Sequence, residues 1–373
     1  MKVLVVLLVS FSAHLAFAKI KEIDSEKIKP ISQAYIQHVQ KTYQNLLEEN
    51  KKLHSAIVDF SKSATDENFN QAKQAWFKAK MSYAKTEVFR FYGGPIDDAE
   101  KGPEPLINSW PIDEVYLDYV KGKPKSGIIQ NKKDYPVLDK KTMQGLNEKN
   151  GERNISTGYH AVEFLLWGQD LSIKSAGQRP LSDFQVKNEH SSRRFEALKS
   201  LSELLIDQTQ YLIEAWKSDS AFVKSWNQQT SKEILRRIMV GTTSLSADEN
   251  SGERLSVALE KNDQENEQNC FSDTSLEDLE NNQIGIINVV VDTGLLEYLK
   301  SIDSIRAQRL NRELLQTLQS LKSIPRPLDK ILLNAKSKDR RLVKVAIEAF
   351  NTQAKSLDLI AGQIGVTLNV QHE

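Results

Sequence analysis

Residues 158–168 read GYHAVEFLLWG, and this stretch decides the fold. Apolar side chains point in almost every direction around it, so a helix over residues 154–167 has no polar face to present to water. Gly168 stands where a glycine commonly ends a helix. We therefore expect a buried helix here, which other elements must cover.

The segments on both sides have the pattern of amphipathic helices. Apolar residues recur three, four or seven positions apart over residues 31–60 and 66–92, and again between 195 and 245 and between 305 and 360. The 16 Gly and 10 Pro residues are few for a β-sandwich and ordinary for a helical protein. Residues 288–291 are rich enough in β-branched side chains to leave a short strand open there. We predict an all-α protein.

The length predicts two packed halves. A chain of 373 residues with this many amphipathic segments exceeds one simple four-helix bundle. We assign residues 19–185 to an N-terminal helical bundle that carries the buried helix, and residues 186–373 to a C-terminal bundle.

The first 18 residues have the pattern of a secretory signal peptide. A positive charge precedes an apolar run over residues 3–9, and Ala16-Phe17-Ala18 forms a small-residue cleavage site. No later run of about 20 apolar residues follows, so we expect no transmembrane span. The pattern predicts export, and we expect a bacterial periplasmic protein.

Charge and the remaining motifs exclude several functions. The 50 Lys and Arg residues balance 50 Asp and Glu residues, which argues against a nucleic-acid partner. The sequence has no nucleophile elbow, phosphate-binding loop or dinucleotide fingerprint. Cys270 is the only cysteine, so the chain can form no internal disulfide, and its acidic surroundings favour an inert thiol over a nucleophile.

One histidine of the six lies inside an apolar helix. His160 is followed three residues later by Glu163, and this spacing places the two side chains about 60° apart on one helix face. An imidazole and a carboxylate so placed can bind one Zn²⁺, iron or copper ion. We expect Glu87, near the end of another helix, to be a third ligand.

Simpler interpretations of the same residues are open. His160 and Glu163 can hydrogen-bond each other, or Glu163 can pair with an arginine. Glu87 can be solvated and pair with Arg90 three positions on. The zinc-peptidase pattern with two histidines around a glutamate, His-Glu-x-x-His, is absent.

Four ordered blocks resemble the imelysin family, the insulin-cleaving metallopeptidase-like proteins of the bacterial periplasm and outer membrane, and within it the iron-regulated branch. The family's Gly-x-His-x-x-Glu motif is matched by Gly158, His160 and Glu163. Two further blocks begin at Ala75 and at Ile107. The fourth block reads SGERLSVALEKNDQENEQNCFSDTSLEDL and is followed by GIINVVVDTG.

The resemblance implies a fold and a site. The fold is two helical bundles related by an approximate two-fold, with the site near their interface. By position, Arg90, Asp97 and Asp113 belong in or near the same cleft. Cys270 and Asp273 keep the local scaffold of a family segment, but two family histidines are replaced, at Gln268 and beside Leu276.

Three functions follow as hypotheses. The first is a periplasmic protein of iron acquisition that binds a divalent metal, iron or zinc, or a metal-bearing ligand at His160 and Glu163, with an outer-membrane or iron-transport partner. The second is a metallopeptidase in which Glu87 or Asp97 relays protons. The third is a structural or partner-docking protein in which the motif only joins the two halves.

Overall fold

The fold is all-α, as predicted. The computed structural model describes residues 20–368, and the expected signal peptide lies outside them. Within residues 20–368 the only β pairing is an isolated bridge between Val120 and Lys123. The alternative of a strand at residues 288–291 is wrong, because they continue helix α11 (Ser275–Asp292). No described helix is long and apolar enough to cross a membrane.

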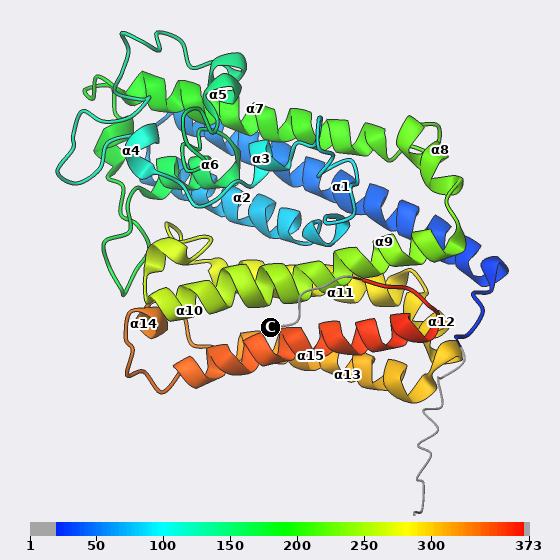
Figure 1. Cartoon of the computed structure of the whole chain (residues 1–373). Coiled ribbons are helices and arrows are strands. Elements are labelled where there is room, and N and C mark those ends of the chain that lie inside the picture. Colours follow the sequence, from blue (N-terminus) through cyan, green and yellow to red (C-terminus); the bar gives the residue numbers. More distant parts are fainter. Residues whose placement is uncertain (1–19, 369–373) are drawn as a thin grey trace, which may run out of the picture.

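The first layer of the molecule is a group of helices around α1 (Ser25–Lys62) and α2 (Asp66–Ala84) (Figure 1). Helices α6 (Gly158–Trp167) and α7 (Ser191–Ala215) pack with them. Shorter elements connect these helices: η1 (Glu87–Phe89), α3 (Glu104–Ile107), α4 (Glu114–Leu117), α5 (Lys140–Leu146), η2 (Leu181–Phe184) and α8 (Ala221–Asn227). The apolar stripe of α1, from Ile28 to Phe60, is buried along the whole helix.

The second layer contains α9 (Ser231–Ser244), α11, α13 (Ser304–Lys322) and α15 (Arg340–Gln363) (Figure 1). Between and around these helices lie η3 (Leu245–Ser256), α10 (Val257–Lys261), η4 (Gln264–Asn266), α12 (Leu295–Ile302) and α14 (Asp329–Leu332). The η3 segment is a π-helix, and it joins α9 and α10 into one rod. π-Helical turns are rare in proteins, and those that occur are often found at functional sites.

The expected boundary at residue 185 falls before α7, and α7 packs on α1 and α6 in the first layer. The two-fold relation between the halves remains a prediction. One continuous apolar core, from Ile28 to Leu368, contains residues of both layers. The layers therefore share a core, and the interface between them is a buried surface.

The two layers approach each other closely because glycines of one layer face the backbone of the other. A Cβ atom on Gly285 of α11 would lie 2.6 Å from the carbonyl oxygen of Lys85, so only glycine fits there. Gly241 of α9 faces the carbonyl oxygen of Val88 in the same way. The turn from Lys85 to Val88 is thus held between α9 and α11, and it carries Glu87.

Candidate metal centre

Helix α6 places the Gly-x-His-x-x-Glu motif at this interface. It begins at Gly158, later than the expected residue 154, because Gly158 has φ +81° and packs against the carbonyl oxygen of Ile107. It ends, as predicted, at Gly168, which has φ +71°. His160 is 1% exposed and Glu163 is 0% exposed. The motif is therefore wholly inside the protein.

The two side chains of the motif bind each other. His160 Nδ1 lies 3.1 Å from Glu163 Oε2. The other oxygen, Glu163 Oε1, accepts hydrogen bonds from the Ser272 backbone N–H at 2.9 Å and from Ser272 Oγ at 2.6 Å. The hydrogen bond within the motif, which was one of the two interpretations of the spacing, is thus present, and no arginine pairs with Glu163 among the described residues.

Burial controls the protonation of the pair. It lowers the pKa of His160 well below its usual value, and the positive charges of Lys80 and Arg254 lower it further. Burial also raises the pKa of Glu163 to about 8, against the opposing effect of Ser272. The imidazole is therefore neutral at neutral pH, and it has one nitrogen with a lone pair.

His160 Nε2 is the open end of this group. It is buried and has no hydrogen-bond partner in the described structure. Where Glu163 is ionised, above its pKa of about 8 or when a cation at the ring favours the carboxylate, Nδ1–H donates to Glu163 and the lone pair falls on Nε2. This is the arrangement of metal-bound histidines that a carboxylate orients. His160 therefore fits a metal ligand through Nε2, with Glu163 holding the ring and its tautomer.

Glu87 lies in a different environment from the one expected. Helix α2 ends at Ala84, earlier than expected, so Glu87 lies three residues after that helix, in the short turn η1. Its carboxylate is fully buried and pairs with both nitrogens of the Arg254 fork from η3. Arg90 Nη1 donates to it at 3.3 Å, so the alternative Arg90 pair is present, although it is not solvated.

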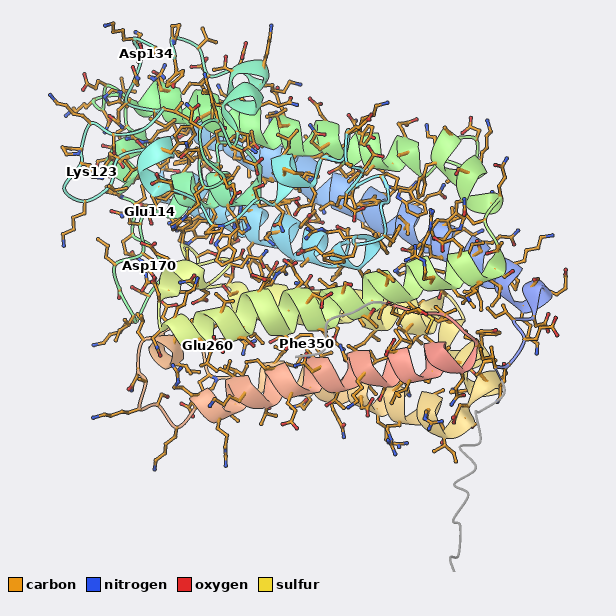
Figure 2. The ribbon with its side chains drawn as sticks, in the orientation of Figure 1. Glu114, Lys123, Asp134, Asp170, Glu260 and Phe350 are labelled. Carbon is orange, nitrogen blue, oxygen red and sulfur yellow. The ribbon has the colours of Figure 1, made fainter. Side chains whose placement is uncertain are left out.

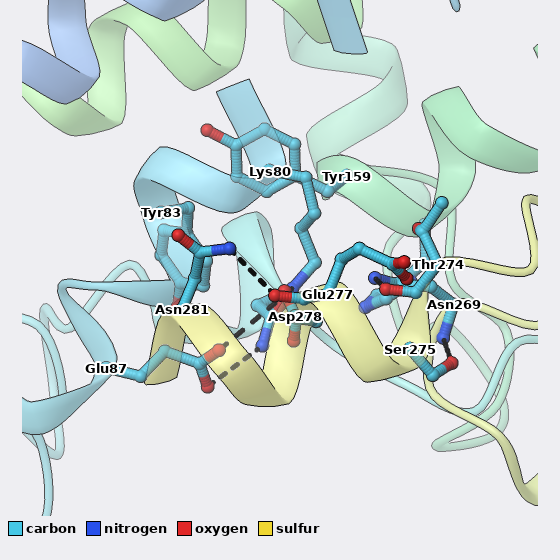
Figure 3. A network of polar contacts seen from close by, with 12 residues as sticks. Lys80, Tyr83, Glu87, Tyr159, Asn269, Thr274, Ser275, Glu277, Asp278 and Asn281 are labelled. Carbon is cyan, nitrogen blue, oxygen red and sulfur yellow. Dashed lines mark hydrogen bonds and ion pairs between the residues drawn. The ribbon is translucent and has the colours of Figure 1, made fainter. Parts of the chain in front are cut away.

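Lys80 and Asp278 complete this ion network across the interface (Figure 3). Lys80 Nζ of α2 lies 2.8 Å from Asp278 Oδ1 of α11 and 4.0 Å from Glu87 Oε1. Arg254 Nη1 lies 3.6 Å from Asp278 Oδ2. Burial alone would raise the pKa of Glu87, but Arg254, Lys80 and Arg90 bring it below its usual value. Glu87 is neutralised by cations, so it does not fit a metal ligand.

The other expected cleft residues separate into four places. Arg90 joins Glu87 to Glu104, whose Oε1 is 3.2 Å from Arg90 Nη2. Asp97 holds its own loop by accepting hydrogen bonds from the backbone of Phe91 and Gly94.

Asp113 caps α4, and it lines a pocket of about 410 Å³ together with Cys270. Burial raises the pKa of the Cys270 thiol well above its usual value, which supports the inert interpretation. Asp273 lies apart from His160, in a group of acids with Asp170 and Asp329.

Four residues of the centre escaped the sequence reasoning: Lys80, Arg254, Ser272 and Asp278. Lys80 and Asp278 are charged residues that a helical pattern would place on a solvated face. Both are 0% exposed. All four lie in blocks that resemble the family: Lys80 is in the block that begins at Ala75, and the other three are in the block over residues 251–279. That resemblance was the available signal.

Comparisons with known proteins agree with the fold and with the family resemblance. The family model described as imelysin matches residues 39–357. Iron-regulated protein A of Synechococcus elongatus is 25% identical over 301 residues, which cover 77% of this chain and 73% of that protein. A solved iron-regulated protein A precursor from Parabacteroides distasonis has 16% identity and a TM-score of 0.72, covering 92% of this chain and 96% of that one. An imelysin-like protein from Psychrobacter arcticum has 13% identity and a TM-score of 0.70, covering 94% and 99%. At these identities the two structures show a shared fold.

Proposed function

This chain belongs to the imelysin family, and we propose that it is an exported protein of iron acquisition. It would bind a metal ion, or a ligand carrying one, at the His160–Glu163 motif, with His160 Nε2 as the ligand atom and Glu163 holding the ring. The family match and the name of the Synechococcus relative support a role connected with iron. The signal-peptide pattern of residues 1–18 supports a periplasmic location, where an outer-membrane or iron-transport partner would act.

The observation that carries the proposal is the unpartnered Nε2 of His160. A buried polar atom without a partner costs about 1–3 kcal/mol, and an ion bound at Nε2 would offset this cost. The ring is neutral, and Glu163 fixes its orientation at 3.1 Å. Iron and zinc both accept imidazole nitrogen, and the bound ion would supply a Lewis-acid centre at Nε2.

The geometry favours binding over peptide cleavage. A metallopeptidase needs an open coordination position beside a groove that takes an extended peptide. His160 and Glu163 are buried, and the turn Cys270–Asp273 lies over Glu163 through Ser272. An ion needs only a small opening to reach Nε2, whereas a polypeptide needs this turn to be displaced.

Elemental analysis tests the proposal. The mature protein is stripped with EDTA, incubated with Fe²⁺ without oxygen or with Zn²⁺, desalted and analysed. We expect His160→Ala to bind one ion fewer per chain. The matched control is His54→Ala. His54 is a half-buried histidine that is distant from the motif in the sequence, and its Nδ1 lies 2.9 Å from Ser202 Oγ.

Equal metal content in the wild type and in His160→Ala would overturn the proposal. A lower melting temperature with equal metal content would favour the structural role of the motif. Restoration of growth under iron limitation, by the wild type but not by His160→Ala in a strain that lacks the gene, tests the connection with iron acquisition.

A further inference from the structure

A second group of acids meets at the end of the molecule where α14 lies. Asp170, Asp273 and Asp329 each offer a carboxylate oxygen, and these oxygens all lie within 4.8 Å of one another. Asp170 follows α6, Asp273 precedes α11, and Asp329 begins α14, so three distant segments converge. Figure 2 labels Asp170 on the loop that passes between the two layers.

Glu267 is an independent observation that points to a ligand. Its side chain is 1% exposed, and neither carboxylate oxygen has a hydrogen-bond partner in the described structure. Burial raises its pKa well above the usual value, and the neighbouring Asp329 and Asp273 raise it further, against a smaller lowering by Ser275. These neighbours show that the Glu267 carboxyl faces the group of three.

The four carboxyls have little compensation from the protein, although the Ser172 backbone N–H donates to Asp170 Oδ1 at 2.9 Å. Both oxygens of Asp329, Asp170 Oδ2 and Asp273 Oδ1 are also buried without a hydrogen-bond partner. In the part of the chain that the structure describes, no Lys, Arg or His forms an ion pair with any of the four. The one nearby cation that acts on Asp273 is Lys330, which is exposed.

We propose that Asp170, Glu267, Asp273 and Asp329 form a binding site for Ca²⁺, separate from His160. The donors are all carboxylate oxygens, which hard cations prefer, and there is no nitrogen or sulfur donor among them. Two ligands on opposite sides of a Ca²⁺ ion at about 2.4 Å are about 4.8 Å apart. Three aspartate oxygens within 4.8 Å of one another can therefore contact one Ca²⁺ ion. Ca²⁺ fits four carboxylates better than Mg²⁺ does, because Mg²⁺ usually keeps several waters and takes only one or two carboxylates.

The site has an entry path and a consequence for the fold. Asp170 lines a pocket of about 380 Å³ that also reaches Gln264 and Leu333, so an ion can approach from this side. Asp170 belongs to the loop after α6 in the first layer, and Asp329 belongs to α14 in the second (Figure 1). A bound ion joins the two layers at the end where the loops meet.

Calorimetry tests the proposal. The mature protein is stripped with EDTA, and its melting temperature is measured with and without 1 mM Ca²⁺, with Mg²⁺ in parallel. We expect Ca²⁺ to raise the melting temperature by several degrees and to bind once per chain in isothermal titration, with a smaller effect of Mg²⁺. Asp329→Asn and Glu267→Gln keep the side-chain shape, and we expect each to reduce Ca²⁺ affinity at least tenfold.

Two variants serve as controls. Glu265→Gln removes an exposed acid at the rim of the same pocket, paired 3.6 Å from Arg153, and it should keep the Ca²⁺ response. His160→Ala should also keep it, which separates this proposal from the iron site. The absence of a Ca²⁺ effect on the wild type would overturn the inference, as would unchanged Ca²⁺ binding in a folded Glu267→Gln. If Asp329→Asn does not fold, the wild type and Glu267→Gln decide.

Discussion

Two clusters of buried carboxyls lie in this protein, and they are balanced in opposite ways. Around Glu87 and Asp278, the acids contact Lys80, Arg254 and Arg90 at ion-pair distances. Around Asp170, Glu267, Asp273 and Asp329, no basic side chain is at such a distance among residues 20–368. In the first cluster the chain itself supplies cations for its carboxylates, whereas the carboxyls of the second cluster have no such cation beside them.

The difference separates structural from ligand-binding acids. A buried carboxylate costs several kcal/mol to desolvate, and the cost is offset by cations or by hydrogen-bond donors. Glu87 has cations, and Glu163 has the two donors of Ser272 together with His160. The acids around Asp329 form no ion pair among residues 20–368, and they have few donors beyond the Ser172 backbone N–H, which donates to Asp170 Oδ1 at 2.9 Å. An ion from solution is therefore the remaining partner. Stability measurements distinguish these three conditions.

The largest effect is expected where the internal compensation is removed. Arg254→Met keeps the length of the side chain but removes one of the two cations that Glu87 and Asp278 share, and Lys80 stays as the other. We expect a loss of about 3–5 kcal/mol in the free energy of unfolding, because Glu87 loses its two-nitrogen partner inside the protein. Urea unfolding followed by circular dichroism measures it.

Arg326→Met is the matched control. Arg326 pairs with Glu277 and Glu280 on the surface, where its side chain is 35% exposed, and its loss should cost at most about 1 kcal/mol. Equal losses in the two variants would show that the buried network contributes no more than a surface pair.

A smaller loss is expected at the hydrogen-bonded acid. Ser272→Ala removes the hydroxyl that donates to Glu163 Oε1 at 2.6 Å and leaves the backbone donor in place. A hydrogen bond to a charged group contributes about 1.5–3 kcal/mol, and we expect a loss near 2 kcal/mol.

The control for this change is Ser126→Ala, because Ser126 Oγ donates to the neutral carbonyl oxygen of Lys123 at 2.8 Å. It should lose about 1 kcal/mol or less. A loss at Ser272 no greater than at Ser126 would contradict a charged Glu163 in the folded protein. Chemical denaturation of both variants at pH 9, above the pKa of about 8, gives the comparison.

The sequence predicted the fold well because helical periodicity is local. The spacing of Tyr35, Val39 and Tyr43 is sufficient to place α1 and its buried face. The motif on α6 was predicted for the same reason, since His160 and Glu163 are one turn apart. The end of α2 was missed, because Val88 and Phe91 continue the apolar pattern after the helix has stopped.

The partners of the site were not predictable from local pattern. Ser272 lies 109 residues from Glu163, and Asp278 lies 198 residues from Lys80. Such pairs depend on how two layers pack, which no periodicity in one segment records. Arg254 has a further difficulty, because the π-helix around it turns less per residue than an α-helix. A helical wheel therefore misplaces its side chain.

A gain in stability is expected in the uncompensated cluster. Asp329→Asn removes one negative charge from four crowded carboxyls, and in EDTA we expect the variant to be more stable than the wild type by about 1 kcal/mol. Glu87→Gln, which removes an equivalent charge from the compensated cluster, should instead destabilise. Urea unfolding in EDTA measures both changes, and a loss for Asp329→Asn in the metal-free protein would contradict the surplus of charge.

The smallest effect is expected at Asp303, a surface acid whose hydrogen-bond donors are all supplied by the protein. It caps α13, accepting from the Arg306 backbone N–H at 3.0 Å and from Gln363 Nε2 at 2.9 Å. These hydrogen bonds lower the pKa of Asp303 from 3.8 to about 2, and the bond from the Arg306 backbone has the largest effect. The folded protein therefore favours the ionised form, so the contribution of Asp303 to the free energy of unfolding is present above pH 4 and is lost as the pH falls towards 2.

Asp303→Ala should cost about 1 kcal/mol at pH 7. In urea titrations its difference from the wild type should shrink between pH 4 and pH 2. The Asp59→Ala variant, which removes an exposed pair with Lys62, should stay within about 0.5 kcal/mol of the wild type throughout.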